Sequence, residues 1–526
     1  MLSTKSYWIS AFFTIALATG FFMLFKNVLP KELFPEGENN ADHIVVDEWM
    51  QEAIKEDSVA ESIADSTHLS SEVILDKSNN DEKQLKSDTL LYIEKNIEDE
   101  LEISPKEIAN ELEENIYLNY FYKSLFELQT QPEARKVRIA YFGDSMTDGD
   151  MIVQDLRKLF QSKYGGRGVG FVPITSESAS SRGSITHKFS RNWEIYSYMK
   201  SYDTIYPYGV SGQVFYQKDT INATTLHLSS GLYAKGGLLQ NPELYYGKSK
   251  NFNGKVRVKT ISDTFELNLE PIKSVNRLKL TQNSTKNLDL EFIEADSIPF
   301  YGVNLDLPYG VQIDNYSNRG NSGLPITQLN TQLMHAFQNA LDYDLIILHY
   351  GTNVLGRGSY EYGWYQSRMT RVVDHLRNAF PNTSILVISI ADKASKYETE
   401  MHTDSAVTHL LASQKAYANN KKTGFVNLFQ LMGGDGSMIE WVEQQPERAN
   451  KDYTHFNHRG AKEIAQMIYN QIDAGFDRYI TEREEAEARK EYRRVQDSIQ
   501  YAEKLKEQKI EEELRQKKDT THVSED

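Results

Sequence analysis

The sequence predicts an α/β protein with a mostly parallel sheet, interrupted by a β-rich insert. Strand-length apolar runs alternate with amphipathic, helix-length runs in residues 106–178 and again in 310–480. Between them, residues 179–309 carry short alternating runs such as TTLHLSS and KVRVKTI, separated by Asn, Gly, Asp and Ser. That pattern is typical of an antiparallel β-sandwich. Three of the expected parallel strands end in small-residue turns, at Ser145, Gly323 and Asn353. Sites in open α/β sheets lie at these carboxyl ends.

Composition limits the possible functions. The chain has 526 residues, with 58 Lys+Arg against 75 Asp+Glu and a net charge of -17. This acidic balance argues against nucleic acid as a partner, because a phosphate backbone requires a basic surface. The absence of cysteine excludes disulfides, thiolate metal sites and a thiol nucleophile, but it does not fix the compartment.

An N-terminal apolar segment predicts a membrane anchor. Residues 7–25 contain no charge and nearly span a bilayer core at about 1.5 Å per residue. The alternative is a cleaved signal peptide, although the small-x-small site at residues 16–18 lies in the middle of the run. Flanking lysines are nearly balanced, so the expected orientation, with the N-terminus inside, depends mainly on the function inferred below.

The next segments read as a linker and the first part of the globular domain. Residues 26–105 form an acidic linker that holds the domain away from the membrane. Residues 106–130 have helical spacing, residues 137–142 form a strand, and a helix begins near Met151. The glycine-rich run GGRGVGFVPI that follows lacks the spacing of a phosphate-binding motif and is expected to form a turn or mobile loop.

The β-rich insert, residues 179–309, has two open interpretations. It is either a structural insertion or a glycan-binding module. Tyrosine rings stack on sugars as readily as they fill a core, and the insert contains many: Tyr206, Tyr208, Tyr233, Tyr245 and Tyr246 are examples.

From residue 310 the alternation of strands and helices resumes. Strands are expected in GVQIDNY, DLIILHY, SILVISI and GFVNLF, and the last core helix in RGAKEIAQMIYNQID. Residues 481–526 are charged almost all round, which predicts a solvated helical tail. A weak coiled coil remains the alternative, and the oligomeric state stays open.

Ser145 is the candidate nucleophile. It follows the buried strand 137–142 at an abrupt break, where a hydroxyl is held out at the carboxyl edge of the sheet. Helix capping by Asp144, Ser145 and Thr147 is the alternative interpretation. A serine nucleophile also needs a base, a carboxylate that orients the base, and donors for the oxyanion.

The remaining catalytic parts follow other expected strands. His455 is the candidate base and Asp452, three residues earlier, the orienting acid; His349, at the end of an apolar strand, is the rival base. The expected oxyanion donors are the backbone N–H of Ser145, the backbone N–H of Gly323 and the side-chain amide of Asn353. This chemistry requires neither a metal nor an organic cofactor.

Taken together and in order, these motifs resemble the four blocks of the SGNH/GDSL hydrolases. The blocks are Gly-Asp-Ser, the glycine of N-x-G-x-S-G, Gly-x-Asn and Asp-x-x-His. The resemblance implies a flavodoxin-like three-layer α/β/α fold over residues 137–178 and 310–480. It assigns Ser145, Asp452 and His455 to the triad, and Ser145, Gly323 and Asn353 to the oxyanion hole. Val354 departs from the Asn-Asp that many members have in the third block.

Narrower features are similar to envelope enzymes that act on O-acetylated peptidoglycan and whose insert resembles a carbohydrate-binding module. They are GGRGVGFVP, the β-rich insert, and MGGDGSMIEWV ahead of DYTHFNHRGA. The expectation is therefore a membrane-anchored serine esterase in a Gram-negative periplasm that removes acetyl groups from a cell-envelope polysaccharide. An O-acetyltransferase with the same triad, or a non-catalytic glycan-binding protein, is the alternative.

Overall fold

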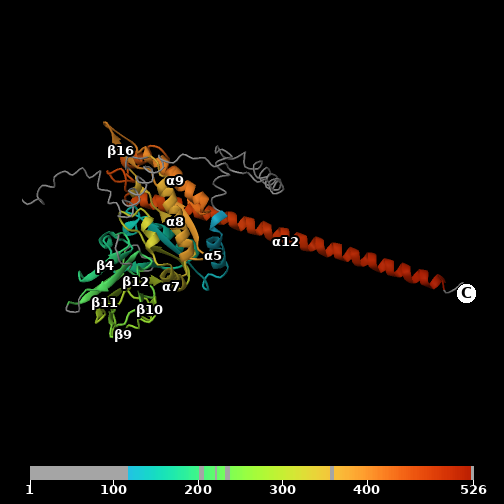
Figure 1. Cartoon of the computed structure of the whole chain (residues 1–526), viewed down its shortest axis with the longest axis horizontal. Helices are drawn as coiled ribbons and strands as arrows, with labels where there is room; N and C mark the ends of the chain where they lie inside the picture. Colours follow the sequence, from blue (N-terminus) through green and yellow to red (C-terminus); the bar gives the residue numbers. More distant parts are fainter. Residues whose placement is uncertain (1–115, 201–205, 219–221, 232–236, 356–359, 523–526) are drawn as a thin grey trace, which may run out of the picture. The chain divides into compact units, whose positions relative to one another are not determined.

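The computed structural model describes residues 116–522, except 201–205, 219–221, 232–236 and 356–359 (Figure 1). The predicted anchor at 7–25 and linker at 26–105 lie outside these ranges. Among the described residues, no helix is both long and apolar enough for a membrane span.

A five-stranded parallel sheet forms the centre of the α/β part. Its strands lie in the order β13, β1, β14, β15, β18, which is the doubly wound order 2-1-3-4-5 when they are counted along the chain. β1 pairs with β13 from Lys136 opposite Gly310, and with β14 from Ile139 opposite Leu345. The five strands are β1 (Lys136–Gly143), β13 (Gly310–Asn315), β14 (Leu345–His349), β15 (Ser384–Ile388) and β18 (Gly424–Val426).

Helices cover both faces of this sheet. Successive residues of each strand point to opposite sides, and the apolar side chains on both sides are buried under helices. Ile139 of β1 packs into one apolar cluster and Ala140 into the other. α7 (Thr331–Leu341), α8 (Gly363–Ala379) and α9 (Ala406–Asn420) share the cluster of Ala140. The opposite cluster contains α5 (Asn119–Thr130), α6 (Val153–Tyr164), α10 (Leu428–Met432), α11 (Ser437–Glu443) and the first turns of α12 (His458–His522). The predicted α/β architecture is confirmed.

Two antiparallel sheets form the insert. One has the order β10, β7, β12, β5, β4, with β2 also paired to β12; the other has the order β3, β6, β11, β8, β9. They enclose a shared apolar core that includes Trp193, Phe292 and Phe300. The strands are β2 (Gly168–Pro173), β3 (Ile185–Phe189), β4 (Trp193–Ser197), β5 (Gln213–Gln217), β6 (Thr224–Ser230), β7 (Glu243–Tyr246), β8 (Lys255–Lys259), β9 (Thr264–Asn268), β10 (Asn276–Lys279), β11 (Asn287–Ile293) and β12 (Phe300–Asp306).

A buried arginine joins the parallel sheet to the insert. Arg138 of β1 is fully buried and makes ion pairs with Asp306 at the end of β12 and with Asp314 of β13. Its guanidinium also donates to Asn304 Oδ1 at 2.5 Å. Arg138 and the two aspartates neutralise one another away from solvent, so removing any one of them would leave an uncompensated buried charge.

Three local expectations differ from the structure. GVGFVP is strand β2, not a loop, because its backbone pairs with β12 and its apolar side chains are buried. The polar segment after β15 contains a hairpin of β16 (Ala394–Tyr397) and β17 (Glu400–Thr403). The last core helix and the charged tail form one continuous helix, α12, whose side chains are mostly exposed from Thr481 to Arg515.

Candidate active site

Ser145 lies in the turn that follows β1. Gly143 ends the strand where the hydroxyls of Thr147 and Ser317 approach; a Cβ at Gly143 would lie 2.1 Å from Thr147 Oγ1. Asp144 closes the turn, since its Oδ1 accepts from the N–H of Met146 at 2.9 Å. Within the part of the chain that the structure describes, the N–H of Ser145 has no acceptor, so it remains available to a ligand.

His455 and Asp452 lie next to Ser145, although they come from a loop 310 residues further along the chain. His455 Nε2 is 2.9 Å from Ser145 Oγ, and His455 Nδ1 is 2.9 Å from Asp452 Oδ2. This is the order of contacts in a Ser-His-Asp triad, in which the acid fixes the tautomer of the imidazole. Phe456, which is buried against Trp441, anchors the loop.

Asp452 is held in its charged form. Partial burial opposes ionisation, but hydrogen bonds from the His455 ring and from two backbone N–H groups outweigh it and lower the pKa of the carboxyl. The N–H groups of Thr454 and His455 each donate to Oδ1 at 3.0 Å. Both lone-pair sides of the carboxylate are therefore engaged, and its orientation toward the ring is fixed.

The rival base His349 lies elsewhere. Its Nδ1 is 2.7 Å from the hydroxyl of Tyr141, and burial lowers its pKa to about 4. His349 is thus a packed, neutral histidine in the core and does not contact Ser145.

Gly323 lies at the start of a 3-10 turn, η5 (Leu324–Gln328), with φ of 90°. This left-handed conformation is strained for other residues. A Cβ here would also lie 2.8 Å from the ring of Tyr350. Both constraints require glycine at this position.

Asn321 engages both of the other expected oxyanion donors. Its Oδ1 accepts from the N–H of Gly323 at 2.8 Å, and its backbone carbonyl accepts from Asn353 Nδ2 at 3.2 Å. Asn353 carries a second N–H, which stays available, whereas the only N–H of Gly323 is shared with this side chain. Asn321 is itself fully buried. Sequence reasoning missed it, because an asparagine in a polar turn gives no distinguishing signal.

The insert also reaches this turn. The hydroxyl of Tyr198, which follows β4, accepts from Asn321 Nδ2 at 3.1 Å. Nearby, Asn318 Nδ2 donates to the carbonyl of Ser211 at 3.4 Å. The loop between β4 and β5 therefore supports the turn that carries Gly323, a role for Tyr198 that the sequence did not indicate.

Most of the tyrosines considered for sugar stacking are core residues. Tyr208, Tyr245 and Tyr246 are no more than 3% exposed. Tyr206 is partly exposed and stacks on Tyr196 with ring centroids 3.7 Å apart. Tyr233 lies outside the described residues.

Fold and site together define a class of protein: a doubly wound α/β protein with the parts of a serine hydrolase at the carboxyl edge of its sheet. A nucleophile, a base and an oriented carboxylate are in contact there, and Asn321 holds the N–H donors of Gly323 and Asn353 together in a neighbouring turn.

Comparison with known proteins agrees with this description. No family model and no curated protein matches the sequence. Among solved structures, a peptidoglycan O-acetylesterase matches with a TM-score of 0.54 and 20% identity over 67% of this chain and 96% of that one. Two further matches are looser. A putative GDSL-like lipase from Parabacteroides merdae matches with a TM-score of 0.25 and 19% identity over 31% of this chain and 73% of that one. A family two carbohydrate esterase from Cellvibrio japonicus matches with a TM-score of 0.24 and 11% identity over 56% of this chain and 98% of that one. The first likeness shows that the fold of this chain is similar to the fold of that protein.

Proposed function

We propose that this chain is a serine esterase that removes O-acetyl groups from a cell-envelope polysaccharide, with peptidoglycan as the preferred candidate. The observation that carries the proposal is the contact chain from Ser145 Oγ to His455 Nε2 and from His455 Nδ1 to Asp452. Two segments 310 residues apart meet there in the geometry that nucleophilic acyl transfer requires.

In the acylation step, Ser145 Oγ attacks the acetyl carbonyl while His455 takes the hydroxyl proton. The negative charge that develops on the carbonyl oxygen is stabilised by the N–H groups of Ser145 and Gly323 and by the amide of Asn353. His455 then gives its proton to the departing sugar oxygen, leaving acetyl-Ser145. Asp452 stabilises the imidazolium throughout.

In the deacylation step, water replaces the sugar. His455 removes a proton from the water, which attacks the acetyl ester and releases acetate. The side chains of His455 and Asp452 are 38% and 47% exposed, so water can reach the base. This exposure favours hydrolysis over transfer to a second sugar, because transferases exclude water from the acyl intermediate.

Other features support the polysaccharide and the cellular location. The insert is a β-sandwich whose loop holds the turn of Gly323, and the fold is that of a peptidoglycan O-acetylesterase. Residues 7–25 would anchor the protein in the cytoplasmic membrane, with the catalytic domain in the periplasm.

The test is acetate release from O-acetylated peptidoglycan by the full-length chain, alongside Ser145→Ala and the control Ser162→Ala on the exposed face of α6. Wild type and the control should release acetate and Ser145→Ala should not, with circular dichroism showing all three folded. Activity retained in Ser145→Ala would refute the mechanism. Acetylated glycan formed from a donor ester and an acceptor sugar would instead identify a transferase.

A further inference from the structure

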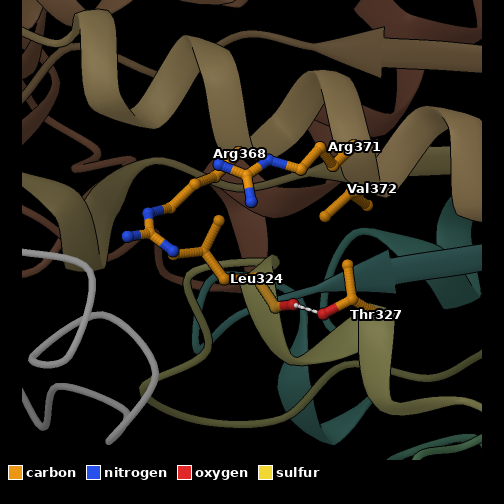
Figure 2. Close-up of a pocket in the computed structure, with 5 residues that line it drawn as sticks. All are labelled: Leu324, Thr327, Arg368, Arg371 and Val372. Atoms are coloured by element: carbon orange, nitrogen blue, oxygen red, sulfur yellow. Dashed lines mark hydrogen bonds between the residues drawn. The ribbon is translucent and has the colours of Figure 1, made fainter. Parts of the chain in front are cut away.

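The tail of α12 exposes large apolar side chains, unlike the helices of the α/β part. In α8, for example, Val372 is buried while Arg368 and Arg371 line a groove beside η5 (Figure 2). α12 continues without a break beyond Thr481 (Figure 1), and its apolar residues there are between 39% and 68% exposed. These exposed residues are Tyr492, Val495, Ile499, Tyr501, Leu505, Ile510 and Leu514.

Most of the apolar residues of the tail share one side of the helix. At 3.6 residues per turn, seven of them fall within about a third of its circumference. This set, the tail stripe, consists of Ala488, Tyr492, Val495, Ile499, Ala502, Ile510 and Leu514. Tyr501 lies on the opposite side. Glu503 and Lys506 interrupt the stripe, but their opposite charges are three residues apart and attract each other.

α12 is fixed to the α/β part only before the tail stripe begins. Tyr479 packs against Tyr122 of α5, and Arg483 lies over the ring of Phe126 at 4.1 Å. From 484 to 515, no hydrogen bond or ion pair joins the helix to any described residue outside α12. Within the described part of the chain, the tail stripe therefore has no partner that covers it.

Opposite charges at the two edges of the stripe lie at equal distances before and after Gln500. They are Arg489 with Glu511, Glu491 with Lys509, and Arg493 with Glu507. A two-fold axis through Gln500 places positions equally far before and after it side by side in two antiparallel copies. Each of the three pairs then joins opposite charges between the copies, and each occurs twice. The same rotation brings the tail stripe onto itself, so that apolar side chains face apolar side chains.

The contact that this arrangement makes is large enough for a reversible dimer. The tail from Glu485 to Arg515 is about 46 Å long, and a contact about 10 Å wide along it covers about 460 Å² of each copy. The total of about 900 Å² is close to the roughly 1,000 Å² that a specific interface needs.

We propose that α12 pairs with the α12 of a second copy of this chain, antiparallel and about a two-fold axis at Gln500. The two tail stripes face each other, and the three charge pairs lie along both edges. Each helix enters its own α/β part near Thr481, and these two points are about 57 Å apart at 1.5 Å per residue. The two α/β parts therefore lie at opposite ends of the pair. This inference does not depend on the catalytic proposal.

Sedimentation velocity of the full-length chain in density-matched detergent, with micelles in excess over protein, measures the association. The wild type should dimerise with a Kd of roughly 1–10 μM. Ile499→Asp places a carboxylate of each copy between the stripes and should raise the Kd more than about 100-fold. The matched control Tyr501→Asp adds the same charge on the opposite side of the helix and should stay within about threefold of wild type. Circular dichroism checks that both variants keep their helices.

A charge reversal tests the pairing across the axis. Arg493→Glu turns two attractive pairs into repulsive ones and should raise the Kd about 10-fold. Adding Glu507→Arg should restore the Kd to within about threefold of wild type. Neither Arg493 nor Glu507 has an ion pair with another described residue, so the exchange leaves the ion pairs within the helix intact.

Cysteine cross-linking tests the antiparallel orientation, because the chain has no cysteine of its own. In the antiparallel pair, the two copies of residue 488 are about 36 Å apart and those of residue 514 about 42 Å apart. Ala488→Cys alone and Leu514→Cys alone should therefore not form disulfide-linked dimers, which require Cα atoms within about 7 Å. A mixture of the two variants should form them under mild oxidation.

Three results would overturn the proposal. The first is a wild type that stays monomeric at about 100 μM, well above the expected Kd. The second is equal association of Ile499→Asp, Tyr501→Asp and wild type, which would place the contact elsewhere in the chain. The third is cross-linking of Ala488→Cys with itself, which would identify a parallel pair.

Discussion

Asn321→Asp should be among the most damaging isosteric changes in this protein. Asn321 Oδ1 accepts the only N–H of Gly323 at 2.8 Å, where the oxyanion must also bind. Two acceptors that share one N–H lie about 4–5 Å apart. At that separation and an effective dielectric constant of about 20, the aspartate would repel the oxyanion by about 3–4 kcal/mol. The rate constant for acylation should fall roughly 10²- to 10³-fold.

Hydrolysis of 4-nitrophenyl acetate at pH 8 measures this effect. Asn321→Ala removes the side chain without adding charge, and its activity should fall less than 10-fold. Asn330→Asp is the matched control: Asn330 caps α7 by accepting from the N–H of Leu333, which an aspartate does equally well. It adds the same charge to the same segment and should keep wild-type activity.

The reasoning fails if Asn321→Asp stays within threefold of wild type, because Gly323 would then not bind the oxyanion. It also fails if Asn321→Ala loses as much activity as Asn321→Asp, since the effect would then come from a distorted turn. An equal loss in Asn330→Asp would reduce the effect to a general dependence on net charge.

Three further predictions concern the triad and the buried charges. Asp452→Asn should lower kcat for 4-nitrophenyl acetate roughly 10³- to 10⁴-fold without unfolding the protein, because an amide no longer fixes the reactive tautomer of His455; a loss below 10-fold would contradict the triad. Burial raises the pKa of Asp144 from 3.8 to about 6. The unfolded chain therefore loses this proton first, and the free energy of unfolding should fall by about 3 kcal/mol as the pH rises from 4 to above 6. In urea titrations across this range, the free energy of unfolding of Asp144→Asn should depend less steeply on pH than that of wild type. An unchanged slope would show that Asp144 is not the source of this dependence. Arg138→Met leaves two buried carboxylates without their partner and should lower the free energy of unfolding by about 3–5 kcal/mol. Lys163→Met, which breaks an exposed pair with Asp473, should cost less than about 1 kcal/mol, and a loss in Arg138→Met no larger than this would show that the buried network is not stabilising.

Sequence reasoning succeeded where local pattern and chain order carry the information. The sequence predicted that Ser145, which follows an apolar run, would meet His455 and Asp452, which precede the last core helix. The structure brings these three side chains together. Strand β2 was missed because its glycines read as a loop, and only the pairing with β12 shows otherwise. Asn321 and Tyr198 were not predictable, because their roles depend on a contact between the insert and the turn of Gly323. The domain boundaries and the N-terminal anchor remain predictions.

The position of β1 in the chain has a consequence for biosynthesis. β1 is made first, but both of its neighbours in the sheet, β13 and β14, follow the insert. Its two edges therefore lack partners on the ribosome while the insert, rich in local hairpins such as β8 with β9, is already able to fold. Once folded, the insert holds β2 against β12, with Gly168 opposite Asp306, and this pairing shortens the loop that must close when β13 joins β1. Ser145 emerges with β1 and meets His455 only after nearly the whole domain has been translated, so the nascent chain carries an inert hydroxyl until the sheet is complete.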